Sequence, residues 1–174
     1  MRKFPTTKFG RKEQRMPELF DFDAFLAAGI AKLTGYCAAI VGPADAEDVA
    51  QEAYLSLWRT RGTIPNEAAA SSYLYRAAYH IALDLIKSRR RMRIPDRPAA
   101  ESDALSEKMV NALCALSPED RAIVYGRVVD ECGYGELAAR FGKSEAWARK
   151  RYSLARKRLA SLLASAKDKK EEIP

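Results

Sequence analysis

The sequence predicts an all-α protein with two small helical domains joined by a flexible linker, the C-terminal domain being a helix-turn-helix. Apolar residues recur every three or four positions through most of the 174-residue chain, which is the spacing of amphipathic helices. A stretch with two prolines and mixed charges, 94–104, divides the chain and has the composition of a linker. Two helical patterns near the C-terminus are separated by a short turn that contains Gly142.

The first helix of the N-terminal domain, 19–93, is expected over 20–41. Gly42 and Pro43 follow it and break the helical pattern. Its apolar residues recur at helical spacing: Phe22, Phe25, Leu26, Ile30, Leu33, Tyr36, Cys37, Ile40 and Val41.

The second helix is expected from Asp45 or Ala46 to about Arg59, because acidic residues at its start suit the positive end of a helix. Its core stripe is Val49, Ala50, Ala53, Leu57 and Trp58. Four residues share another face at i, i+3, i+4 and i+7, and we call them the acidic ridge: Asp48, Gln51, Glu52 and Leu55. An apolar residue among polar ones suits a protein-binding surface better than a solvated face. A surface ridge without a partner is the alternative.

A third helix is expected over 72–90, after a loop over 60–70. Its buried stripe is Leu74, Ala77, Ala78, Ile81, Leu85 and Ile86. The positions expected to be exposed mix aromatic with basic side chains: Tyr73, Tyr75, Arg76, Tyr79, His80, Lys87 and Arg89, followed by Arg90, Arg91 and Arg93. Rings stack on unpaired bases while cations hold the backbone, so this mixture suits single-stranded nucleic acid. Alternatively, the tyrosines lie at the edge of the core and the arginines are solvated.

The C-terminal domain, 105–165, begins with helices expected over 105–116 and 119–130, the second capped by Ser117 and Pro118. In the helix-turn-helix, Gly142 ends one helix and Ser144 caps the next, whose buried stripe is Ala148, Tyr152, Ala155 and Leu159. The second helix carries Arg149, Lys150, Arg151, Arg156, Lys157 and Arg158. A basic helix after a tight turn fits the DNA major groove, whereas a solvated basic helix is the alternative. Trp147 is either a packing residue or a DNA-facing aromatic.

Charge and composition indicate a folded, intracellular, nucleic-acid-binding protein. The formal net charge is +7, and basic segments (1–18, 63–98 and 132–174) alternate with acidic ones (19–62 and 99–131). Residues 1–18 are expected to form a basic flexible extension and 166–174 a polar tail. The three cysteines lie far apart without a CxxC pair, and the single histidine has no partners at ligand spacing, so we expect no metal, cofactor or disulfide framework. No apolar run is expected to reach the ~20 residues of a membrane helix, so no membrane insertion is predicted.

The order of these motifs resembles an extracytoplasmic-function (ECF, group IV) sigma factor of the sigma-70 family. The resemblance rests on an acidic helix (DAEDVAQEAYLSLW), an aromatic and basic helix (SYLYRAAYHIALDLIKSRRR), a linker, and the segments LSPEDRAIVYGRVVDECGYGELAARFG and ARKRYSLARKRL. It covers about residues 20–163. It implies a cytoplasmic bacterial promoter-specificity subunit, often of a stress response, that binds core RNA polymerase and is controlled by an anti-sigma factor.

The resemblance also implies roles for particular residues. The acidic ridge (Asp48, Gln51, Glu52 and Leu55) would dock on the clamp helices of the polymerase beta-prime subunit. The third helix would hold the single-stranded minus-ten promoter element through Tyr73, Arg76, His80, Lys87, Arg89, Arg90 and Arg91. The helix-turn-helix would read the duplex minus-thirty-five element, next to the beta flap, through Ser144, Glu145, Trp147, Arg149, Lys150 and Arg151. Family members commonly have Asn at the position of His80, so an altered minus-ten preference is expected.

Two other classes of protein compete with this interpretation. A stand-alone dimeric helix-turn-helix regulator would bind palindromic duplex DNA without polymerase, but it leaves the acidic ridge and the aromatic and basic helix unexplained. A nucleic-acid enzyme such as a recombinase or nuclease would need a catalytic constellation, and the sequence has no phosphate-binding loop, nucleophile elbow or paired carboxylates. We therefore expect no enzymatic activity.

Overall fold

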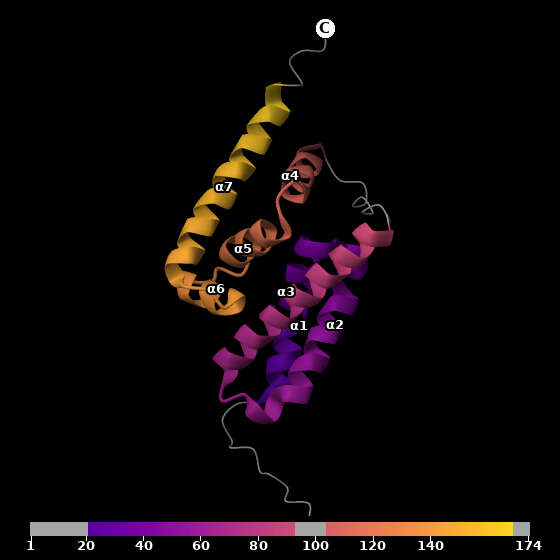
Figure 1. The fold of residues 1–174 in the computed structure, drawn as a ribbon, viewed down its shortest axis with the longest axis vertical. Coiled ribbons are helices and arrows are strands. Elements are labelled where there is room, and N and C mark those ends of the chain that lie inside the picture. The colour runs from indigo at the N-terminus through magenta and orange to yellow at the C-terminus, as the bar shows by residue number, and fades with distance from the viewer. Residues whose placement is uncertain (1–20, 93–103, 169–174) are drawn as a thin grey trace, which may run out of the picture.

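The structure, a computed structural model, describes residues 21–92 and 104–168, and all regular structure in these ranges is helical. The all-α prediction is confirmed. The helices are α1 (Phe22–Val41), α2 (Pro43–Thr60), the short 3₁₀ helix η1 (Arg61–Thr63), α3 (Glu67–Met92), α4 (Ala104–Cys114), α5 (Pro118–Val128), α6 (Tyr134–Phe141) and α7 (Glu145–Asp168). Helices α1–α3 form one bundle and α4–α7 form a second group beside it (Figure 1).

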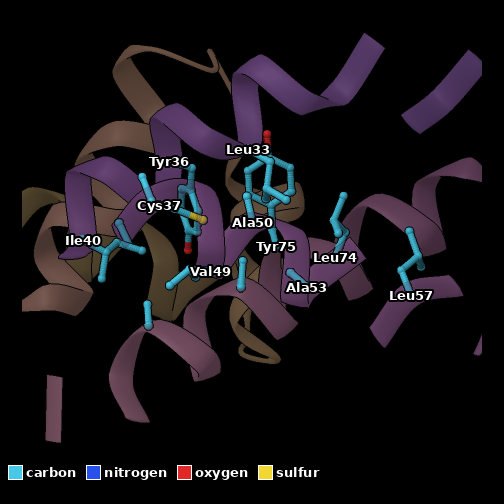
Figure 2. Packing of buried hydrophobic residues seen from close by; sticks show 14 of the residues in the cluster. Leu33, Tyr36, Cys37, Ile40, Val49, Ala50, Ala53, Leu57, Leu74 and Tyr75 are labelled. Atoms are coloured by element: carbon cyan, nitrogen blue, oxygen red, sulfur yellow. The ribbon is translucent and has the colours of Figure 1, made fainter. Parts of the chain in front are cut away.

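The core of the first bundle combines large side chains from all three helices, such as Leu33, Leu57 and Leu74, with several alanines of α2 and α3 (Figure 2). Leu33 and Tyr36 of α1 are almost fully buried, and so are Ala53 of α2 and Ala78 of α3, whose small side chains let helices approach closely. Burial also raises the pKa of Tyr36 well above its usual value and that of Cys37 to about 12. This core fixes the outer faces of α2 and α3, which carry the acidic ridge and the predicted DNA-binding residues.

The helix-turn-helix has the local features that the sequence predicts. Gly142 ends α6 in the left-handed region (φ 63°), and the Ser144 hydroxyl accepts a hydrogen bond from the Trp147 N–H at 3.2 Å at the start of α7. Ser117 caps α5 in the same way through the Asp120 N–H. The second core joins these helices through Leu116, Ile123, Val124, Cys132, Leu137, Ala138, Ala148 and Ala155.

Several helix boundaries differ from the predicted ones. Pro43 does not separate two helices but occupies the first turn of α2, where a missing N–H costs no hydrogen bond. Helix α3 starts at Glu67, five residues earlier than expected, because the Asn66 side chain accepts a hydrogen bond from the Ala69 N–H. Helix α7 continues to Asp168 and so includes the start of the predicted 166–174 tail. The predicted extension, 1–18, nearly all of the linker, 94–104, and the rest of the tail lie outside the described residues.

The expectation that no apolar run reaches the length of a membrane helix is wrong for α1. By length and composition, α1 could cross a membrane, since its mean hydropathy reaches 1.7. Only some of its apolar side chains are buried in the bundle, namely Leu33, Tyr36, Cys37 and Ile40. Ile30 is instead 54% exposed. Helix α1 packs against α2, α3 and α5.

The two groups of helices pack against each other. Helix α1 contacts α5, and α3 contacts α6 (Figure 1). Phe141 of α6 packs on both cores, and Ala122 of α5 is buried in the first one. The domains therefore share an interface in addition to the chain connection.

Candidate functional site

An apolar groove of about 900 Å³ runs between α1 and α2. Ile30, Leu55 and Trp58 line it and are between 45% and 54% exposed. The remaining lining residues are Leu26, Ala31, Thr34, Glu47, Ala50, Gln51 and Tyr54. So many exposed large apolar side chains in one groove are typical of a protein-binding surface.

All four residues of the acidic ridge (Asp48, Gln51, Glu52 and Leu55) are exposed on α2, along the side of this groove. Gln51 and Leu55 also line the groove, and the Gln51 amide donates to Glu47 at 3.4 Å. The structure thus brings the ridge together as predicted and adds apolar groups that the sequence interpretation had assigned to the core. Trp58 is the clearest case, since it was expected in the core stripe.

The Trp58 ring is held in place at the end of the groove. It contacts the Phe22 ring, with centroids 5.5 Å apart, and the Arg61 guanidinium lies 3.8 Å from its centroid. Arg61 also donates to the Trp58 carbonyl at 2.6 Å. An exposed, oriented aromatic ring is a strong anchor for a protein partner.

The predicted minus-ten residues do not all share one environment on α3. Arg76 and His80 are exposed, as are Lys87, Arg90 and Arg91 near the helix C-terminus. Arg89 is half-buried and forms an ion pair with Asp45, which ties α3 to the start of α2. Tyr73 is half-buried and shares a 2.9 Å hydrogen bond with Ser56, an interaction that lowers the pKa of its phenol.

Tyr75 was expected to be exposed but is buried. Its ring packs edge-on against Tyr36, with centroids 5.0 Å apart, and the Arg140 guanidinium of α6 lies 3.5 Å from its centroid. This burial, which depends on the second domain, raises the pKa of Tyr75. The neighbouring turn of α3 is also covered, because the Tyr79 ring packs edge-on against Phe141 at 5.1 Å.

The predicted minus-thirty-five residues lie at the start of α7, and most of their side chains reach solvent. Ser144, Glu145, Arg149 and Lys150 are exposed, with Arg149 paired to Glu145. Trp147 is half-buried against Phe141 at 5.3 Å, which favours the packing alternative for this residue. The exposed tip and flank of α7 keep the shape of a helix that enters the major groove.

Arg151 differs from its neighbours because its charge is satisfied within the protein. Its guanidinium binds Asp120 at 2.7 Å and Glu119 at 3.0 Å, and it donates to the Ser117 hydroxyl at 3.2 Å. These contacts join α7 to the start of α5. Sequence reasoning missed this structural use, although two carboxylates after a cap residue were a visible signal.

A buried ion pair lies behind the helix-turn-helix. Arg140 is 4% exposed and binds Asp130, 5% exposed, at 2.7 Å, and it also binds the more exposed Glu136 at 3.0 Å. Its hydrogen bond to Asp130 and its charged neighbours keep the pKa of Arg140 raised although burial acts in the opposite direction. No sequence pattern pointed to Arg140.

No group of three or more His, Cys, Asp or Glu side chains placed to hold a metal ion occurs within 21–92 and 104–168. The surfaces described above consist instead of an apolar groove with an acidic rim, an aromatic and basic helix, and a basic helix that follows a turn. Such surfaces bind protein and nucleic acid.

Comparison with known proteins places both domains in one family. The family model described as Sigma-70 region 2 matches residues 30–92, and the model described as Sigma-70, region 4 matches residues 106–159. The chain is 33% identical over 130 residues to the ECF RNA polymerase sigma factor SigM from two strains of Mycobacterium tuberculosis. That match covers 68% of this chain and 64% of the length of SigM.

A solved structure supports the same fold. The sigma factor RpoE of Bartonella quintana, crystallised with the anti-sigma factor NepR, matches with a TM-score of 0.63 at 22% identity, over 83% of this chain and 97% of that one. The first bundle is thus sigma-70 region 2 and the second group of helices is region 4. The chain belongs to the sigma-70 family and is similar to its ECF members.

Proposed function

We propose that this protein is an alternative bacterial sigma factor of the ECF type, which binds core RNA polymerase and directs promoter recognition, melting and transcription initiation. The observation that carries the proposal is the α1–α2 groove of region 2, where the acidic ridge stands beside exposed Ile30 and Trp58. A stand-alone regulator that binds duplex DNA without polymerase does not require a protein-binding groove of this kind. The site of action would be the cytoplasm.

In this proposal the groove and ridge dock on the clamp helices of the beta-prime subunit. Apolar side chains supply the buried contact area, and the Asp48 and Glu52 carboxylates select a basic partner surface and speed the encounter. The exposed Leu55 belongs to the same ridge as these two carboxylates and itself lines the groove. This combination supports a specific interface with a positively charged rim on the polymerase side.

The DNA-binding steps would be divided between α3 and α7. Helix α3 would hold the displaced strand of the minus-ten element, with Arg76 and His80 near the bases and the cluster at 87–91 on phosphates. Along a helix the distance from residue 76 to residue 90 is about 21 Å, long enough for several nucleotides. Exposed Arg149 and Lys150 would anchor α7 on the duplex minus-thirty-five element, close to the beta flap.

Control by an anti-sigma factor is part of the proposal. It is supported by the Bartonella quintana relative, whose sigma factor was crystallised with one. An inhibitor of this kind would have to cover the groove, the DNA-binding helices or both.

The direct test is binding of the full-length protein to purified bacterial core polymerase, followed by fluorescence anisotropy of the labelled protein. We expect saturable one-to-one binding in the nanomolar to micromolar range of specific protein interfaces. If the protein fails to bind core polymerase but binds palindromic duplex DNA as a dimer, the stand-alone regulator replaces this proposal.

A further inference from the structure

We propose that the basic N-terminal segment of the chain, residues 1–20, binds in the α1–α2 groove of the free protein and competes with core polymerase for it. The inference rests on the proposed function, because it concerns the regulation of the same groove. The segment lies outside the described residues. Three observations support the proposal: the apolar lining of the groove, the point at which the segment joins α1, and the opposite charges of the segment and the groove.

The groove exposes apolar side chains that normally have an occupant. Ile30, Leu55 and Trp58 are each about half exposed, and all three line one groove of about 900 Å³. This volume is in the range of pockets that bury most of a bound ligand. Large contiguous apolar surfaces on a protein mark sites of interaction. The described residues line the groove without filling it, so an occupant from elsewhere in the chain has room to bind.

The segment joins the described chain at one end of this groove. Asp21 caps α1 by accepting a hydrogen bond from the Ala24 N–H at 3.0 Å. Phe22, the first residue of α1, contacts the Trp58 ring with centroids 5.5 Å apart. Trp58 lines the end of the groove. Residue 20 is therefore only two positions from a side chain that touches the groove lining.

A few residues are enough to run the length of the groove. Its lining on α2 extends from Glu47 to Trp58, which is about 17 Å at the rise of a helix. An extended chain advances ~3.3–3.6 Å per residue, so about five residues would cover this length. In this proposal residues 16–20 start at the Trp58 end and occupy the groove, which brings Arg15 to the Glu47 end.

The sequence of residues 16–20, MPELF, suits such a groove. Met16, Leu19 and Phe20 are apolar, and methionine adapts well to irregular apolar surfaces. Pro17 has a fixed φ and also restricts the residue before it to extended conformations. A segment that is restricted before binding loses less conformational entropy when it binds.

The charges of the segment and of the first two helices are opposite. Residues 1–20 contain six Lys or Arg and two Glu, whereas residues 21–60 contain six Asp or Glu and two Lys or Arg. The cations nearest to residue 16 are Lys8, Arg11, Lys12 and Arg15. At the far end of the groove, Glu47 and Asp48 are exposed on α2. Attraction between these groups favours the orientation in which the apolar residues lie in the groove and the cations lie at its acidic end.

Attachment to α1 makes even a weak contact effective. A segment tethered this closely has an effective concentration of about 1 mM, so one that binds with a Kd of about 0.1 mM as a separate peptide would occupy the groove in about nine molecules of ten. Polymerase can bind only the remaining molecules, which lowers its apparent affinity about tenfold. The free protein would thus keep its apolar groove covered and still yield it to a stronger partner.

Occupancy of the groove is measured by acrylamide quenching of Trp58 fluorescence in the full-length protein. A Trp147→Phe background leaves Trp58 as the only tryptophan. Replacing two apolar residues of the segment, Met16→Ser with Leu19→Ser, should expose the Trp58 ring, increase its quenching and shift its emission to longer wavelength. The conservative variant Met16→Leu with Leu19→Met keeps the apolar contacts and should be protected like the wild type.

A matched control removes apolar side chains away from the groove. Val128→Ser with Val129→Ser makes a comparable change at residues of region 4 that are 60% and 59% exposed. This variant should leave Trp58 quenching unchanged, because neither valine lines the groove.

The charge contribution is tested with a second pair of variants. Arg11→Glu with Lys12→Glu should increase Trp58 quenching, because it replaces attraction to the acidic end of the groove by repulsion. Lys157→Glu with Arg158→Glu makes the same change in net charge on exposed residues of α7 and should not alter quenching. In the wild type, protection of Trp58 should weaken as salt is added, since salt screens exposed charges.

Competition is measured by titrating core polymerase into the labelled full-length protein. Met16→Ser with Leu19→Ser should bind core polymerase about tenfold more tightly than the wild type, because its groove is no longer occupied. The conservative variant Met16→Leu with Leu19→Met should bind with the wild-type affinity.

Each outcome supports or overturns the proposal. Equal quenching of Trp58 in the wild type and in Met16→Ser with Leu19→Ser overturns it. Protection that rises with protein concentration also overturns it, since the occupant would then be a second copy of the chain. A quenching difference without a gain in polymerase affinity overturns the competition. If no variant binds core polymerase, the proposed function fails, whereas a quenching difference would still support binding of the segment in the groove.

Discussion

The guanidinium of Arg140 lies 3.5 Å from the centre of the Tyr75 ring, in the other domain, and binds Asp130 in its own domain at 2.7 Å. One side chain thus supports both the fold of region 4 and its packing on region 2. Because Arg140 and Asp130 are almost completely buried, neither charge has water available if the other is removed.

Replacing Asp130 with Ala should lower the free energy of unfolding of region 4 by about 3 kcal/mol, since it leaves the buried Arg140 with one weaker partner. Glu136→Ala removes the other, more exposed partner of the same guanidinium and should cost less than about 1 kcal/mol. Urea unfolding is best followed in a Trp58→Phe background, where Trp147 reports on region 4 alone. Equal costs for the two variants would contradict the assignment of Asp130 as the main partner.

Reversing charge on the acidic ridge should weaken polymerase binding. The double variant Asp48→Lys with Glu52→Lys should reduce the affinity for core polymerase at least tenfold, about 1.4 kcal/mol, because the partner surface is expected to be basic. Circular dichroism should be unchanged, since both side chains are exposed. The control is Asp84→Lys with Glu131→Lys, which makes the same charge change away from the groove. Equal loss in both would mean that net charge, and not the ridge, drives binding.

Removing exposed cations from α7 should weaken duplex binding and spare polymerase binding. Arg149→Ala with Lys150→Ala should reduce the slope of log affinity against log salt by about 1.8, if each cation neutralises one phosphate. Lys32→Ala with Arg59→Ala removes the same charge from exposed positions of region 2 and should leave the slope nearly unchanged. Anisotropy titrations on a minus-thirty-five duplex at several salt concentrations measure both. An unchanged slope in the α7 variant would exclude phosphate contacts by these residues.

The free energy of unfolding should fall in alkaline solution. Burial raises the pKa of Cys37 from 9.0 to about 12 and also raises that of Tyr54 to about 12. A group whose pKa is higher in the folded state stabilises the fold fully below its unfolded pKa, and that contribution is lost as the pH rises through the folded value. Urea midpoints should therefore hold to about pH 9 and decline towards pH 12. A constant midpoint over this window would contradict the burial of these groups.

Local features of the sequence predicted the helices and the helix-turn-helix well, because caps and turns depend on neighbouring residues. Ser117, Gly142 and Ser144 have the roles in the structure that their residue types suggested. The first residues of two helices were predicted wrongly, because the residue type at each start is compatible with two structural roles. Pro43 served as a helix start although the pattern suggested a break, and Asn66 was a cap inside an expected loop.

The candidate surfaces were harder to predict because they depend on packing between segments far apart in the sequence. Periodicity placed Trp58 in the core and Tyr75 on the surface, and both assignments were wrong. Trp58 is 45% exposed and lines the groove, and Tyr75 is buried between the Tyr36 ring of its own domain and the Arg140 guanidinium of region 4. A helical pattern shows which residues share a face, but it does not show how many faces are covered.

The most direct test of the central claim is run-off transcription with purified core polymerase and genomic promoter fragments, with and without this protein. If the protein is a sigma factor, transcripts with a defined start will depend on its presence, and the Asp48→Lys with Glu52→Lys variant will need at least tenfold more protein to produce them. The contradicting result is an absence of protein-dependent transcripts while the protein binds duplex DNA tightly on its own, since that is the behaviour of a conventional regulator.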